Sequence, residues 1–307
     1  MPSQQASERT LRFPGPVSPG HTLAPQRRGP RDPCFQIDTD GAIWRTSLLP
    51  SGPVTARISR TAADVVRCQA WGAGAEQFID ALPALLGIDD DATDFQPNHP
   101  TVAAATARVP HLRIGRTSRV LEALIPAVIE QRVPGADAFR SWRLLVTKFG
   151  TPAPGPAPAM MRVPPSAQQW CAIPSWEFHR ANVDPGRART LVGCARRADS
   201  LERLVARPPA EAREALTSLP GVGVWTAAET AQRALGDADA LSIGDYHVAK
   251  MIGWTLTGRP IDDATMVELL EPMRPHRYRV VRLLEVSGLA YEPRRGPRLP
   301  VQRISRL

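Results

Sequence analysis

The chain has few cysteines, and it has no long hydrophobic run. Its four cysteines, Cys34, Cys68, Cys171 and Cys194, follow neither a zinc nor an iron–sulfur spacing. So few thiols without a pairing pattern are typical of a reducing cytosol. No apolar stretch is long enough to cross a membrane, and no secretory h-region is present. We therefore expect a cytoplasmic protein with no metal centre and no membrane partner.

What the chain has in excess is positive charge. Its 307 residues include 38 basic and 30 acidic ones, which gives a formal net charge of +8. This excess favours a polyanionic partner. The arginines gather at both ends of the chain, in residues 1–33, which are also rich in proline, and in residues 293–307. We expect both ends to be flexible basic arms.

A small antiparallel α+β domain is predicted over residues 34–112. Alternating apolar runs begin near Phe35, Val54 and Val66, and each indicates a strand. Apolar residues from Phe78 onward then recur at helical spacing. The acidic cluster 89–91 lacks the glycine and the glutamate of a calcium loop, so we expect a solvated loop or a helix cap there.

The rest of the chain, residues 113–292, has mostly helical periodicity and contains no internal repeat. Pro126 falls inside the first of these helices and predicts a kink or an early break. Residues 151–165 are rich in proline and alanine, which favours a mobile insertion. Taken together, the fold class is α+β: a mostly helical core preceded by a small sheet domain.

A glycine turn, LPGVG at residues 219–223, joins two predicted helices. Gly221 and Gly223 can adopt positive φ without steric cost. Successive backbone N–H groups at a helix N-terminus make a site suited to a phosphate. A bare glycine turn is more often only a packed corner, so a second feature is needed to favour a binding site.

The second feature is Asp245, which follows Ile243-Gly244 at the expected start of the next helix. We expect its side chain to cap that helix, from where the carboxylate can also face a cleft. Trp225 and Glu229 lie one turn apart on the helix after the glycine turn, so they share a face. Asp237 and Asp239 lie in a loop of small residues, where a solvated turn is expected.

This combination resembles the helix-hairpin-helix DNA glycosylases over about residues 119–290. The segments that look like the alkylbase (3-methyladenine II) branch are Leu121–Val133, Trp225-Thr226-Ala227, Gly244-Asp245-Tyr246 and Arg274–Tyr278. The resemblance implies an enzyme of base excision repair, cytoplasmic and associated with the nucleoid. Its partner would be double-stranded DNA with a damaged base, bound by a monomer.

The resemblance also assigns roles to individual residues. Asp245 would be the catalytic carboxylate, close to the sugar of a nucleotide flipped out of the duplex. Members with lyase activity carry a lysine where this chain has Trp225, so hydrolysis without strand cleavage is expected. The residues that would contact DNA are Gly221, Val222, Gly223, Thr226, Gln131 and Arg132. No cofactor and no iron–sulfur cluster is expected, although the hairpin could hold a monovalent cation.

The predicted base pocket departs from the branch, which stacks several aromatic rings on a cationic base. Trp225 and Tyr246 match, but Glu229 and Glu285 stand where rings are expected. These carboxylates could attract a cationic purine, accept hydrogen bonds from a neutral base, or pair with nearby arginines such as Arg277, Arg279 or Arg282. An alkylated base is the leading substrate.

Two further readings stay open at this point. The chain could be a glycosylase for oxidised or deaminated bases, or a noncatalytic DNA-binding protein that keeps the hairpin. Arg132 could fill the gap left by the flipped base, or it could contact phosphate.

Overall fold

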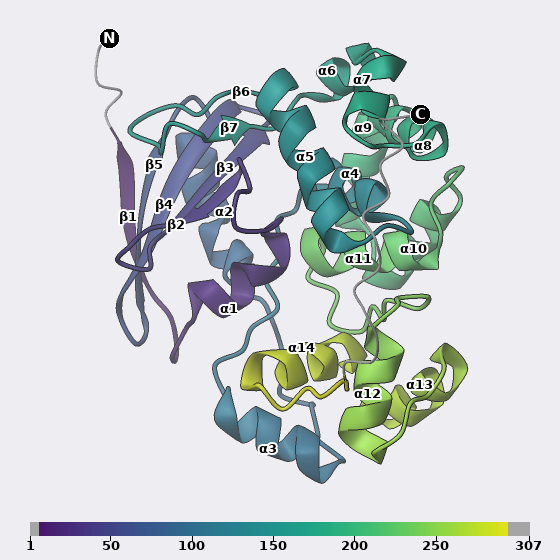
Figure 1. The fold of residues 1–307 in the computed structure, drawn as a ribbon. Helices are drawn as coiled ribbons and strands as arrows, with labels where there is room; N and C mark the ends of the chain where they lie inside the picture. Colours follow the sequence, from purple (N-terminus) through teal and green to yellow (C-terminus); the bar gives the residue numbers. More distant parts are fainter. Residues whose placement is uncertain (1–5, 294–307) are drawn as a thin grey trace.

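A computed structural model describes residues 6–293 of the chain. Figure 1 shows a sheet with its own helices on one side, a larger helical group beside it, and a third group of helices below. Three separate hydrophobic cores correspond to these groups. The predicted basic tail, from residue 294 onward, lies outside the described residues. The α+β fold class is confirmed.

The sheet has five antiparallel strands in the order β1-β5-β4-β3-β2. Apolar residues alternate along the strands, so one face is buried against α2 (Ala75–Leu85) through Phe78, Ile79 and Leu82. The strands are β1 (Ser7–Arg12), β2 (Phe35–Ile37), β3 (Ile43–Leu49), β4 (Gly52–Ala62) and β5 (Val65–Trp71). The strands predicted from alternation are therefore present.

The predicted flexible N-terminal arm is wrong from residue 6 onward. β1 pairs along its whole length with β5, and α1 (Pro19–Leu23) and η1 (Ala24–Gln26) follow it. Phe13, Val17 and Leu23 are almost fully buried in the sheet core. These apolar residues are too widely spaced for a periodic pattern. The segment is held by distant partners, since the N–H groups of Phe13 and Val17 donate to the carbonyls of Asp64 and Ala63. The sheet domain therefore starts before the predicted boundary at residue 34.

The larger helical group surrounds α4 (Val120–Glu130), which packs against α5, α8, α9 and α11. The predicted early break at Pro126 is wrong, because the helix continues for another turn to Glu130. Leu124, Ile125 and Val128 are almost fully buried around the proline. This packing offsets the backbone hydrogen bond that proline cannot donate.

The remaining helices of this group vary in length. They are α5 (Gly135–Phe149), α6 (Ala167–Ala172), α7 (Ser175–Arg180), α8 (Pro185–Ala195), α9 (Ala198–Glu202), η2 (Arg203–Ala206), α10 (Pro209–Thr217) and α11 (Val224–Ala234).

The third group contains α3 (Pro100–Arg108), α12 (Val248–Thr257), α13 (Asp263–Leu270), η3 (Glu271–Met273) and α14 (Arg277–Ser287). Helix α3 packs against α14, more than 160 residues later in the chain. The predicted domain boundary at residue 112 is therefore wrong, because α3 belongs with the last helices and not with the sheet.

The predicted mobile insertion at residues 151–165 is also wrong. It forms a small hairpin of β6 (Thr151–Pro152) and β7 (Arg162–Val163). Met161 is buried in a cluster with Trp44 and Trp71, whose rings stack with centroids 5.6 Å apart. The carbonyl of Arg162 also accepts a hydrogen bond of 2.6 Å from the Thr46 hydroxyl. Proline-rich composition does not imply mobility where aromatic rings cover the segment.

The four thiols are free, and none of them forms a disulfide. Burial raises the pKa of Cys68 to about 12 and that of Cys194 to about 11. Burial likewise raises the pKa of Cys34 well above its ordinary value. Within residues 6–293, no helix is long and apolar enough to cross a membrane.

The docking of the proline-rich hairpin can be tested with Trp71→Ala. The ring is 7% exposed, so its loss should lower the free energy of unfolding by about 3 kcal/mol. It should also open the 153–160 segment to limited proteolysis. Trp176→Ala is the matched control, because that ring is 61% exposed. Equal stability of the two variants would contradict the docking.

Candidate active site and nucleic-acid interface

The glycine turn joins α10 to α11 as a helix–hairpin–helix unit. Gly221 has a φ of +82°, and Gly223 is the N-cap of α11 with extended backbone. The backbone N–H groups of Gly223, Val224 and Trp225 make no hydrogen bond within the described part of the chain. They lie at the positive end of the helix dipole, so this turn can bind an anion such as a phosphate.

Position 221 requires glycine because of its backbone conformation and because of a close neighbour. A Cβ atom at this position would lie 2.0 Å from Oγ1 of Thr190 on α8. At Gly223, by contrast, a Cβ atom would meet nothing within 4 Å. The turn is therefore pressed against α8 at one glycine and open to solvent at the other.

Gln131 connects the loop after α4 to this turn. Its Nε2 donates hydrogen bonds to the carbonyl of Gly221 at 2.9 Å and to Oγ1 of Thr226 at 2.8 Å. Two predicted DNA contacts are thereby corrected. The Thr226 side chain is buried and its hydroxyl is engaged by Gln131, while the Val222 side chain is buried and its N–H donates to the Leu219 carbonyl. Both residues hold the turn from inside.

Arg132, next along this loop, is exposed and has a φ of +55°. A non-glycine residue in this region is strained by about 1–2 kcal/mol. Its guanidinium has no hydrogen bond or ion pair within residues 6–293. The strained backbone holds a free cation beside the turn.

Asp245 lies on the loop between α11 and α12, and its carboxylate is held at both oxygens. Oδ1 accepts from the N–H groups of His247 at 2.8 Å and Val248 at 3.1 Å, so the side chain caps the start of α12 as predicted. The N-cap position itself is His247, and the helix begins at Val248 and not near Tyr246. Oδ2 accepts from Nε1 of Trp225 at 3.0 Å. Since Asp245 is half-buried, the carboxylate is oriented yet reachable from solvent.

The two aromatic residues predicted to line the base pocket, Trp225 and Tyr246, differ in their surroundings. Trp225 is half-buried beside Asp245, at the start of α11. Tyr246 is 63% exposed, and Nζ of Lys250 lies 3.6 Å from the centre of its ring. The structure therefore brings Trp225 to the carboxylate, whereas one face of Tyr246 is covered by a cation.

Both glutamates of the predicted pocket form ion pairs. Glu229 pairs with Arg233 at 2.8 Å and accepts a hydrogen bond from the Ser242 hydroxyl. Glu285 pairs with Arg282 at 2.5 Å. Burial disfavours the charge of Arg233, but Glu229, Tyr278 and Glu130 together outweigh burial, so the pKa of Arg233 is raised.

Of the arginines named as partners for these glutamates, Arg277 and Arg279 pair elsewhere. Arg277 makes a bidentate pair with Asp239, through Nε at 2.8 Å and Nη2 at 2.6 Å. Arg279 pairs with Asp90. The expectation of solvated loops at Asp90 and Asp239 is therefore wrong, because both carboxylates are buried.

Asp237 is buried as well and pairs with Arg213 of α10. The loop that carries Asp245 is thus tied to α10 on one side and to α14 on the other. The sequence shows the charges, but it does not show which of 36 arginines meets which carboxylate.

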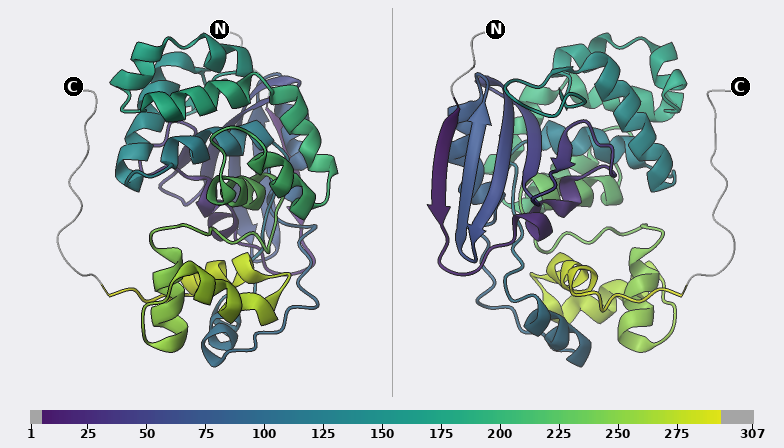
Figure 2. Two further views of the ribbon diagram at one scale, coloured as in Figure 1. Left: turned by 90° about the vertical axis from the view of Figure 1, so that its right-hand side faces the viewer. Right: turned by 60° about the vertical axis from the view of Figure 1, so that its left-hand side comes forward.

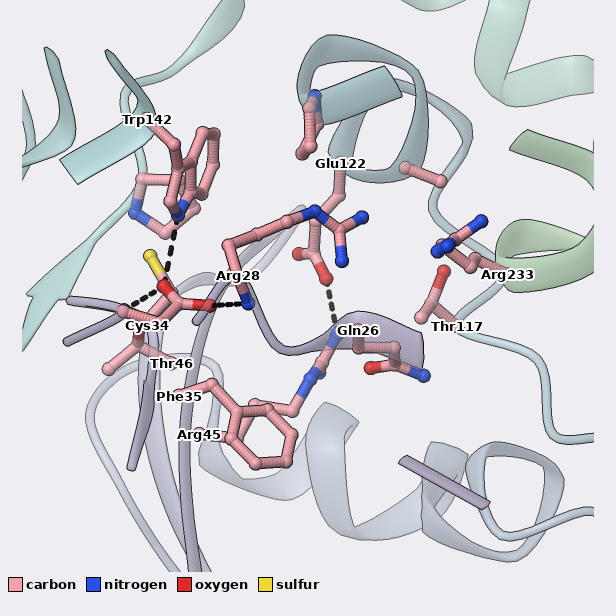
Figure 3. Close-up of a pocket in the computed structure, with 14 residues that line it drawn as sticks. Gln26, Arg28, Cys34, Phe35, Arg45, Thr46, Thr117, Glu122, Trp142 and Arg233 are labelled. Atoms are coloured by element: carbon pink, nitrogen blue, oxygen red, sulfur yellow. Dashed lines mark hydrogen bonds and ion pairs between the residues drawn. The ribbon is translucent and has the colours of Figure 1, made fainter. Parts of the chain in front are cut away.

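A cavity of about 50 Å³ lies away from this site, between the sheet, α4, α5 and α11. Figure 3 shows Arg28, Arg45, Glu122 and Arg233 around it. Neither Trp225 nor Asp245 is among its lining residues, and its volume suits a few water molecules. Within residues 6–293, no group of three or more histidine, cysteine or acidic side chains could hold a metal ion.

Comparison with known proteins identifies several named proteins to which the chain is similar. No protein-family model matches the chain. It is 30% identical over 235 residues to the probable bifunctional transcriptional activator/DNA repair enzyme AlkA of Mycobacterium tuberculosis. This match covers 70% of the chain but only 45% of that relative, so the chain spans less than half the length of the relative.

Two solved structures share the fold over nearly the whole chain. The 3-methyladenine DNA glycosylase of Archaeoglobus fulgidus has a TM-score of 0.77 at 17% identity, covering 91% of this chain and 98% of its own. The Clostridium acetobutylicum 8-oxoguanine glycosylase/lyase, in complex with double-stranded DNA, has a TM-score of 0.69 at 12% identity, covering 94% and 99%.

The tight packing of the turn predicts that Gly221→Ala is costly. The variant should lose about 2–4 kcal/mol of unfolding free energy, because alanine adds both positive-φ strain and the clash with Thr190. Adding Thr190→Ala should restore the part due to the clash. Gly223→Ala should be nearly neutral. Thermal unfolding measures all three, and a Gly221→Ala variant as stable as Gly223→Ala would refute the packing argument.

Proposed function

We propose that the chain belongs to the helix-hairpin-helix DNA glycosylase superfamily, whose alkylbase branch it resembles. We further propose that it is a monofunctional DNA glycosylase of base excision repair. It would hydrolyse the N-glycosidic bond of a damaged, alkylated base flipped out of duplex DNA. It would act as a monomer and without a cofactor.

The observation that carries this proposal is the hydrogen bond from Trp225 to Asp245. It joins the helix that follows the phosphate-binding turn to the loop that carries the carboxylate. A protein that only grips phosphate gains nothing from a carboxylate fixed beside its own anion site, because like charges repel. A carboxylate in this place is useful when positive charge develops on the sugar.

Breaking an N-glycosidic bond gives the sugar the character of an oxocarbenium ion. A carboxylate oriented before the reaction stabilises this charge and directs a water molecule to the sugar. Asp245 has its two oxygens oriented by three N–H donors, two from the start of α12 and one from Trp225.

Hydrolysis without lyase chemistry follows from the residue at position 225. The lyases of the superfamily form a Schiff base with a lysine at this position, and here it is Trp225. The nearest alternative amine, Lys250, lies over the ring of Tyr246. With no amine at the sugar, water is the nucleophile and an abasic site is the product.

Support for an alkylated substrate comes from the named relatives and from Trp225. The Mycobacterium tuberculosis relative is named as a DNA repair enzyme, and the Archaeoglobus fulgidus protein as a 3-methyladenine glycosylase. Trp225 offers a ring on which a flipped base can stack. Glu229 and Glu285 do not supply free negative charge, because Arg233 and Arg282 neutralise them.

A substrate panel tests the reaction and the catalytic residue together. Duplexes containing 3-methyladenine, 7-methylguanine, hypoxanthine, uracil, 8-oxoguanine or ethenoadenine should release only alkylated bases. Asp245→Asn should lower the rate of release at least 100-fold, since the charge on the sugar is lost. It should keep the unfolding temperature, because asparagine also caps helices.

Each other outcome of the panel has a definite meaning. Full activity of the Asp245→Asn variant would show that Asp245 is not a catalytic residue. Strand cleavage without heat or alkali would refute the monofunctional reaction. Release of uracil or 8-oxoguanine alone would show that the substrate is a deaminated or oxidised base and not an alkylated one. Tight duplex binding with no release of any base would favour the noncatalytic DNA-binding protein.

Trp225→Phe separates stacking from orientation. Phenylalanine keeps an aromatic ring but lacks the N–H that donates to Asp245. The maximal rate should fall about tenfold, as expected when one hydrogen bond of about 1.4 kcal/mol is lost at the transition state. The KM should change less than twofold. A rise in KM with an unchanged maximal rate would instead mean that the ring acts only in binding.

A further inference from the structure

A group of three arginines on α5 and the N-terminal segment has no acidic partner. Arg140 and Arg143 lie three residues apart on one face of α5, and Arg31 precedes β2. Arg31 is exposed and the other two are half-buried. Within residues 6–293 none of the three guanidinium groups makes a hydrogen bond or an ion pair, whereas most arginines near the candidate site are paired.

The segment that carries Arg31 is pinned to α5 by buried contacts. Oδ1 of Asp32 accepts a hydrogen bond from Nε1 of Trp142 at 2.9 Å, and Oδ2 accepts one from the N–H of Arg28 at 2.7 Å. Gly29, with a φ of +79°, packs directly against the ring of Phe139 on α5. Figure 2 shows this segment between the sheet and the helical group.

The charges of the group act on one another. Burial lowers the pKa of the Arg143 guanidinium, and the positive charges of Arg31 and Arg140 lower it further. The acidic residue of the same helix, Asp137, is buried and forms no ion pair with them. Mutual repulsion of this kind costs free energy unless an anion binds.

The group is connected to the candidate site through one loop. Helix α5 begins at Gly135, directly after the loop that holds Gln131 and the free cation of Arg132. Gln131 in turn is bonded to the carbonyl of Gly221 in the phosphate-binding turn. At 1.5 Å per residue, Arg140 and Arg143 lie about 8 and 12 Å along α5 from its first residue. The two arginines thus lie on the helix that leads away from the loop beside the turn.

We propose that Arg31, Arg140 and Arg143 form a second DNA-binding surface, which holds the sugar-phosphate backbone of the duplex that flanks the flipped nucleotide. This inference rests on the proposed function and adds to it an anchoring point outside the hairpin. Its contacts would be to phosphates only, so they would not depend on base sequence or on the lesion. A duplex bound at both the turn and this surface would be held at two points along its length.

The test measures the salt dependence of binding to an undamaged duplex of 25 base pairs. Each phosphate contact contributes a slope of about 0.9 to the fall of log affinity with log salt. Arg140→Ala/Arg143→Ala should lower the slope by about 1–2 and weaken binding at least tenfold in 50 mM salt. Arg31→Ala should lower it by about 1. The control Arg60→Ala/Arg259→Ala removes two equally unpaired charges elsewhere and should change the slope by less than 0.5.

A second experiment distinguishes a role in DNA binding from a role in catalysis. In single-turnover assays at saturating enzyme, the Arg140→Ala/Arg143→Ala variant should keep the wild-type rate of base release. In multiple-turnover assays, its KM for the lesion-containing duplex should rise. A slope equal to that of the control pair would overturn the proposal, and so would a larger loss of affinity for duplex RNA than for DNA. Because the binding arm uses undamaged DNA, it stays decisive even if no base is ever released and the proposed function fails.

Discussion

The site depends on the pairing of two buried carboxylates with arginines of neighbouring helices. Asp237 pairs with Arg213 of α10, and Asp239 makes a bidentate pair with Arg277 at the start of α14. These pairs hold the loop between α11 and α12 against two other helices. Removing one partner of a buried pair costs about 3–5 kcal/mol, because the other charge stays buried. The position of Asp245 follows from them, since it lies six residues beyond Asp239.

A second set of contacts does the same for the side that carries the hairpin turn. Gln131 bonds both the carbonyl of Gly221 and the hydroxyl of Thr226, so the loop after α4 and the hairpin turn keep one relative position. Trp142 and Asp32 hold the N-terminal segment to α5. Polar groups buried between elements, and not the elements themselves, set the geometry of the surface. Each is satisfied by a partner far away in the sequence.

This explains which features could be read from the sequence. The glycine turn, the cap by Asp245 and the strands after Phe35 are local patterns, and the structure confirms them. The order of residues 6–33 and of 151–165 depends on distant partners such as β5 and Trp71. Composition alone therefore predicted flexibility where the chain is folded. Ion pairs were among the possible roles predicted for Glu229 and Glu285. Arg282, the partner of Glu285, was among the predicted partners, but Arg233, the partner of Glu229, was not.

The burial of the thiols has a consequence for the conditions under which such a protein works. Methylating agents are electrophiles, and a cysteine reacts with them as the thiolate. With pKa values of about 12 and 11, Cys68 and Cys194 remain almost entirely protonated at neutral pH, and Cys34 is shifted in the same direction. These three thiols are thus poor targets for the reagents that damage DNA bases. A protein that removed alkylated bases, as proposed, would thus have these three thiols shielded from the same reagents.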